Sequence, residues 1–117
     1  MKSFAIMPDS HSEKAINAFK NEHFNCAQSV LAGFRQELPI SNELLAQFKA
    51  FGGGRAEGGL CGALYAALHL AKDQKAKDFI TENFAKEAGS TKCREIRAGK
   101  KLACDGCVAL AAKLLAE

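Results

Sequence analysis

Residues 60–72 read LCGALYAALHLAK, a stretch in which almost every position is apolar. Its alanine and leucine content and its length favour a helix, and it contains none of the β-branched residues that strands prefer. A helix that is apolar on all its faces is normally buried on most sides. The stretch therefore predicts a central helix with the rest of the chain packed around it.

The segments on both sides of this stretch also repeat apolar residues with a helical period, and no β-branched run alternates at period two. Asn25 and Ser41 are suitable N-caps, Pro39 stops a helix, and Gly89 is suitable as a C-terminal stop. The sequence predicts an all-α, compact single-domain bundle of five to six helices over residues 1–117. The expected helices span about residues 10–22, 26–38, 42–51, 60–72, 74–88 and 103–116, with a short turn over 93–97.

Composition limits the class of protein. The 117 residues are 48% hydrophobic, enough for a core that does not depend on disulfides. The N-terminal apolar patch at residues 4–7 ends at Pro8 and is far shorter than the apolar region of a secretory signal. No stretch approaches the ~20 apolar residues of a membrane span. We therefore expect a cytoplasmic protein without a membrane partner, in a compartment that keeps thiols reduced.

The net charge of +3 comes with one basic run and no aromatic residue inside it. Nucleic-acid binding normally needs a concentrated basic face together with aromatics or a known motif. We expect a solvent-exposed face and no nucleic-acid partner. The run consists of Lys92, Arg94, Arg97, Lys100 and Lys101.

A glycine-rich loop, GGGRAEGG at residues 52–59, precedes the central helix. Five glycines in eight residues exclude a helix interior. The loop lacks the Gly-Lys-Ser/Thr ending of a phosphate-binding loop, and no strand precedes it. We expect its glycines to let backbone approach neighbouring helices or a bound cofactor closely.

The chain has five cysteines, and four of them fall at expected helix starts. Backbone N–H groups and the helix dipole stabilise a thiolate at such positions, and the thiolate is the form that binds metal or attacks a disulfide. The fifth, Cys107, makes a C-x-x-C pair with Cys104. In a cytoplasmic protein this content favours metal binding or redox chemistry. The four at helix starts are Cys26, Cys61, Cys93 and Cys104.

The order of these motifs resembles the redox-active protein family named C_GCAxxG_C_C, over about residues 17–115. The resemblance is carried by NCAQSVL at 25–31, FGGG at 51–54 and GLCGAL at 59–64, followed by Cys93 and Cys104. It implies a small helical redox protein whose family cysteines are Cys26, Cys61, Cys93 and Cys104, and it suggests an iron–sulfur site. Two positions depart from the family: Ala66 replaces a common glycine, and Cys107 stands where an apolar residue is usual.

Three functions remain open. In the first, Cys26, Cys61, Cys93 and Cys104 hold an iron–sulfur cluster for electron transfer or redox sensing with a partner protein, with zinc as a redox-silent variant of the site. In the second, Cys104 and Cys107, or a long-range pair such as Cys26 and Cys61, exchange disulfides without a cofactor. In the third, the chain is a helical interaction module with structural cysteines. Neither an enzymatic reaction nor an oligomeric state follows from the sequence.

Overall fold

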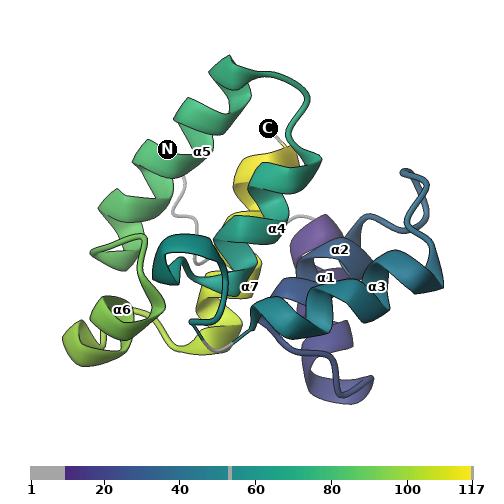
Figure 1. Ribbon diagram of the computed structural model, residues 1–117, viewed down its shortest axis with the longest axis horizontal. Coiled ribbons are helices and arrows are strands. Elements are labelled where there is room, and N and C mark those ends of the chain that lie inside the picture. Colours follow the sequence, from purple (N-terminus) through teal and green to yellow (C-terminus); the bar gives the residue numbers. More distant parts are fainter. Residues whose placement is uncertain (1–9, 53, 117) are drawn as a thin grey trace.

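The computed structural model describes residues 10–52 and 54–116, and within them the chain forms seven α-helices, two short 3-10 helices and no strand (Figure 1). The apolar patch at residues 4–7 lies outside the described residues. Among the helices that are described, none is long and apolar enough to cross a membrane. The elements are α1 (Ser10–Asn21), α2 (Cys26–Gly33), α3 (Asn42–Phe48), η1 (Lys49–Phe51), η2 (Glu57–Gly59), α4 (Gly62–Leu70), α5 (Gln74–Ala88), α6 (Cys93–Gly99) and α7 (Cys104–Ala116).

The all-α class is confirmed, but the expected count of five to six helices is wrong because α6 forms where a turn was predicted. Ile96 is 3% exposed, so the short helix gains stability by burying an apolar side chain. Ser90 supports its start, accepting a hydrogen bond from the Lys92 backbone and donating one to the Glu95 carboxylate. Lys100, in the left-handed region at φ 56°, ends it.

Three predicted helix boundaries are confirmed by cap geometry. Asn25 caps α2 in a capping box with Gln28, and the Ser41 hydroxyl accepts from the Leu44 backbone at the start of α3. Gly89 ends α5 in the left-handed conformation at φ 91°. Helix α2 is shorter than expected and ends at Gly33, because the chain tightens into turns before Pro39.

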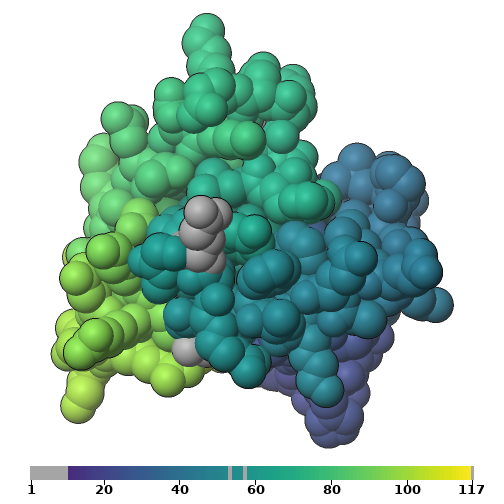
Figure 2. Space-filling view, viewed as in Figure 1, coloured from purple at the N-terminus to yellow at the C-terminus, as the bar shows by residue number. Residues whose placement is uncertain are grey.

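The central helix predicted by the apolar stretch is α4. Its residues Ala63, Leu64, Ala66 and Ala67 are completely inaccessible to solvent. Helices α2, α5 and α7 pack against α4, and α1 covers α2 and α7. Figure 1 shows α4 and α7 in the middle of the molecule, with α5 and α6 to one side and α1–α3 to the other. Figure 2 shows the teal segment that leads into α4 lying between these two sides.

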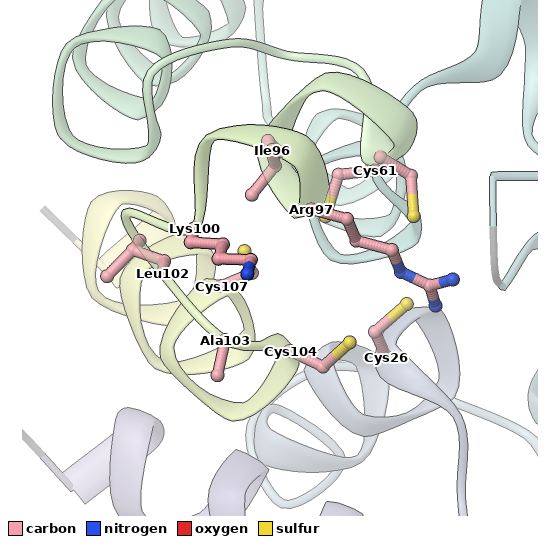
Figure 3. A pocket seen from close by; sticks show the side chains of 10 residues that line it. Cys26, Cys61, Ile96, Arg97, Lys100, Leu102, Ala103, Cys104 and Cys107 are labelled. Carbon is pink, nitrogen blue, oxygen red and sulfur yellow. The ribbon is translucent and has the colours of Figure 1, made fainter.

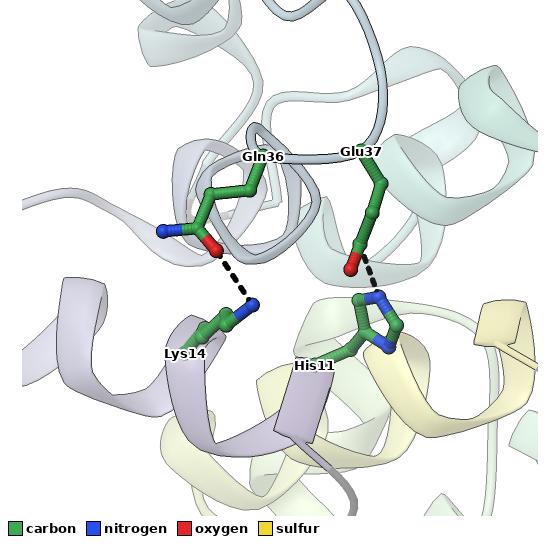
Figure 4. A network of polar contacts seen from close by, with 4 residues as sticks. All are labelled: His11, Lys14, Gln36 and Glu37. Carbon is green, nitrogen blue, oxygen red and sulfur yellow. Dashed lines mark hydrogen bonds and ion pairs between the residues drawn. The ribbon is translucent and has the colours of Figure 1, made fainter.

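The contact between α1 and α2 combines a close backbone approach with polar links at its edge. His11 stacks on Phe34 with ring centroids 4.3 Å apart and pairs with Glu37 just beyond α2 (Figure 4). Lys14 donates to the Gln36 side chain at 2.8 Å. A Cβ on Gly33 would lie 2.9 Å from the His11 carbonyl oxygen, so the two backbones meet without space for a side chain.

Substituting Gly33→Ala should therefore lower the free energy of unfolding by about 1 to 3 kcal/mol, the usual cost of overpacking. Gly99→Ala is the matched control: a Cβ there meets nothing within 4 Å, and the φ of Gly99 is not positive. The control should be neutral or stabilising by up to about 1 kcal/mol. Urea unfolding of both variants measures the difference, and equal stability would contradict this account of the helix contact.

Candidate functional site

All five cysteines line one cavity of about 310 Å³ (Figure 3). Cys26, Cys93 and Cys104 are the first residues of α2, α6 and α7, and Cys61 is the N-cap of α4. Cys107 lies one turn into α7. Residues far apart in the sequence thus point their sulfurs into a common space. The rest of the lining is Ile96, Arg97, Lys100, Leu102 and Ala103.

The Asn25 side chain fixes the start of α2 and therefore the position of Cys26. Its oxygen accepts from the Gln28 backbone at 2.9 Å, and its nitrogen donates to the Lys49 carbonyl at 2.9 Å. A Cβ on Gly52 would lie 2.6 Å from that nitrogen. The NCAQ and FGGG motifs therefore form one unit, in which the glycine provides room for the capping side chain.

Gly62 brings the start of α4 into contact with the start of α2. A Cβ at this residue would lie 2.7 Å from the Cys26 sulfur and 2.7 Å from the Phe51 carbonyl oxygen. Both distances are too short for any side chain. The glycine after Cys61 is therefore a steric requirement for placing the Cys26 and Cys61 thiols together.

The glycine loop also connects the cavity to α6. The Cys61 backbone N–H donates to the Thr91 carbonyl at 2.9 Å, and Leu60 forms an isolated antiparallel bridge with Lys92. Gly54, at φ 84°, lies against Cys93, where an added Cβ would be 3.4 Å from the Cys93 Cβ. The expected close backbone approach is therefore present, and it holds Cys93 beside Cys61.

Burial of the thiols increases from the surface inward. Cys104 is exposed, Cys26 and Cys93 are half-buried, and Cys61 and Cys107 are buried at 5% and 3% exposure. An external molecule therefore reaches Cys104 most readily, and the Cys61 and Cys107 thiols have little contact with solvent.

The predicted preference for thiolate at helix starts is wrong for two of these cysteines. A hydrogen bond with Cys107 and burial together raise the pKa of Cys61 to about 12, although a hydrogen bond with Cys26 acts in the opposite direction. Burial also raises the pKa of Cys93, against the lowering effect of the Arg97 charge. Desolvation and neighbouring thiols thus outweigh the helix dipole at both sites.

Arg97 is the main electrostatic residue at the mouth of the cavity. Electrostatic interaction with Cys93 and a hydrogen bond with Cys104 raise the pKa of its guanidinium, so it stays charged. Sequence reasoning assigned Arg97 and Lys100 only to a solvated basic face and missed their place in the cavity lining. The spacing of Arg97 four residues after Cys93 was the available signal, because such residues share one helix face.

The described residues include no group of three or more His, Cys, Asp or Glu side chains that could hold a metal ion as they stand. A single tetrahedral zinc ion needs four sulfurs about 2.3 Å from one point. The five thiols instead surround a larger space. The cavity thus brings together every sequence-predicted site residue without gathering the thiols around one ion position.

Comparison with known proteins identifies one match. Residues 24–117 match the family model described as "Putative redox-active protein (C_GCAxxG_C_C)". No curated protein and no solved structure matches the chain. The match includes all five cysteines and begins somewhat later than residue 17, where the sequence resemblance was expected to start.

Alkylation of the folded, reduced protein at about pH 8 should modify Cys104 much faster than Cys61. Cys104 is exposed, whereas a pKa of about 12 leaves roughly one Cys61 thiol in ten thousand ionised at that pH. Raising the pH should speed Cys61 modification, because the thiolate fraction grows toward its pKa. Peptide mapping by mass spectrometry over time gives the order, and equal rates at Cys61 and Cys104 would contradict it.

Proposed function

The chain belongs to the C_GCAxxG_C_C family of redox-active proteins, and from this we propose that its cavity is a redox centre built on the four family cysteines. In this proposal Cys26, Cys61, Cys93 and Cys104 hold an iron–sulfur cluster, and the protein transfers electrons or senses redox state. The observation that carries it is the convergence of these thiols, from four separate helix starts, on one cavity.

The chemistry of the donor set supports an iron–sulfur cluster over a single metal ion. Iron–sulfur clusters are normally held by four cysteine thiolates. Because a cluster contains several iron and sulfide ions, its ligands surround a larger volume than the ligands of one zinc ion do. A cavity of about 310 Å³ with no carboxylate in its lining fits an iron–sulfur cluster better than a single zinc ion. When bound, such a cluster supplies one-electron redox chemistry.

The chain's own residues would orient the ligands and control the environment of the site. Helix starts direct backbone N–H groups toward the cysteines, and hydrogen bonds to sulfur help set a cluster's potential. Ile96 and Leu102 supply apolar walls that limit water, and Arg97 places a positive charge beside the Cys93 and Cys104 sulfurs. This charge would offset part of the negative charge of four thiolates.

A second candidate, thiol–disulfide exchange, is favoured by the sulfur contacts of Cys61. This thiol is hydrogen-bonded with both Cys107 and Cys26, so it has neighbours with which it could pair. In such a reaction, a thiolate attacks a substrate disulfide and releases one thiol, and a second cysteine then resolves the mixed disulfide and releases the other. Two electrons pass to the substrate and one disulfide forms in the protein. Cys104, as the exposed member of the C-x-x-C pair, would be the attacking residue.

Two substitutions separate these candidates. After anaerobic reconstitution with iron and sulfide, Cys61→Ser should lose most of the bound iron and the visible absorption, because an incomplete ligand set does not hold a cluster. Cys107→Ser is the matched control: it makes the same change at another buried cysteine of the cavity and should retain near wild-type iron. Iron and sulfide analysis with circular dichroism measures both effects.

Other outcomes would contradict the cluster. The protein could instead catalyse disulfide exchange without binding iron. If Cys107→Ser abolishes this exchange and Cys61→Ser affects it only mildly, the second candidate, acting through the C-x-x-C pair, replaces the cluster. Negligible effects of both substitutions on iron content and exchange would contradict both candidates, leaving the cysteines structural in a helical interaction module.

A further inference from the structure

The excess positive charge of the chain is concentrated beside the mouth of the cysteine cavity. Residues 92–101 carry five basic side chains and one acid, whereas the remaining sequence carries eleven basic and twelve acidic residues. All five basic side chains are exposed. They are Lys92, Arg94, Arg97, Lys100 and Lys101, and we call them the α6 basic surface.

This surface is continuous with the redox site. Arg97 and Lys100 line the cavity itself, together with Cys104, the exposed thiol. In Figure 3 the side chains of Arg97 and Lys100 extend over the space that the sulfurs face. A molecule that approaches Cys104 from solvent therefore meets positive charge before it meets sulfur.

Few negative charges counter this surface. Glu95, the acid within the segment, is exposed and accepts a hydrogen bond from Ser90. Asp105, at the start of α7, lies 3.9 Å from the Lys20 ammonium group. Neither residue lines the cavity. The potential at the mouth is thus positive.

We propose that the α6 basic surface is the docking site for an acidic electron-carrier protein, which exchanges electrons with the site through the Cys104 side of the cavity. This inference rests on the proposed redox function and supplies the class of its partner. Complementary charge speeds encounter and aligns redox proteins without requiring a large or permanent interface.

The extent of the surface favours a protein over a small anion or a nucleic acid. Lys92, Arg94 and Lys101 do not line the cavity, so the charge covers a wider area than a small anion would use. Helix α6 has seven residues and carries no aromatic side chain for stacking on bases. A cationic rim around an exposed thiol instead suits a partner that must reach the sulfur site.

The test uses flavodoxin as an acidic carrier, mitochondrial cytochrome c as a basic one, and the double variant Arg94→Glu/Lys101→Glu. Neither substituted residue lines the cavity. Flavodoxin should bind the unmodified protein at low salt and more weakly as salt screens the charges. The double variant should weaken this binding at least about tenfold, because like charges then face each other. Cytochrome c should not bind. NMR titration of labelled protein measures affinity and maps the surface.

The matched control is Lys72→Glu/Lys75→Glu, which makes the same change in net charge at exposed residues that line a separate groove. It should change flavodoxin affinity by no more than about twofold, as expected for charges outside an interface. The proposal would be overturned if both double variants lost the same amount of flavodoxin affinity, if cytochrome c bound as tightly as flavodoxin, or if flavodoxin did not bind. Tighter binding of a DNA duplex than of flavodoxin would overturn it in favour of a nucleic-acid surface. Because binding is measured, the result does not depend on the iron content that tests the cluster.

Discussion

The Cys26 sulfur lies against the first turn of α4, at a point where even one additional carbon atom on Gly62 would not fit. This contact joins the starts of α2 and α4, so it determines where two of the five thiols stand. The capping side chain of Asn25, placed against Gly52, holds the same junction from its other side. Gly52 and Gly62 therefore help position the cysteine site, because their lack of a side chain leaves room for Asn25 and for the Cys26 sulfur.

From this junction the remaining cysteines are placed by backbone links and helix packing. The hydrogen bond from the Cys61 backbone to Thr91 brings the start of α6 beside the start of α4. Helix α7 packs against both α2 and α4, which places Cys104 at the rim and Cys107 against Cys61. The result is a gradient from an exposed thiol to buried ones, with the exposed cations Arg97 and Lys100 also in the cavity lining. This arrangement suits a redox site, because the exposed end can exchange electrons with partners in solution while the buried end has little contact with water.

Much of the fold follows from local signals in the sequence. The apolar run at residues 60–72 predicted a central helix, and Asn25, Ser41 and Gly89 marked boundaries that the structure retains. These signals are local because caps and periodicity involve residues within one or two turns. Helix α6 was expected only as a turn, because seven residues carry little periodic information and its stability depends on burying Ile96 in a tertiary contact.

The sequence by itself determined the helical class, the central place of α4 and the four helix-start cysteines, because each depends on residue type and short-range spacing. Only the tertiary structure decided that these cysteines surround one cavity, that Cys107 contacts Cys61, and that Arg97 extends over the mouth. It also decided the acidity of Cys61, since a hydrogen bond with Cys107 and burial raise its pKa where the helix start alone favours the thiolate. The physical reason is that side chains from distant segments meet only when helices pack, and desolvation depends on that packing.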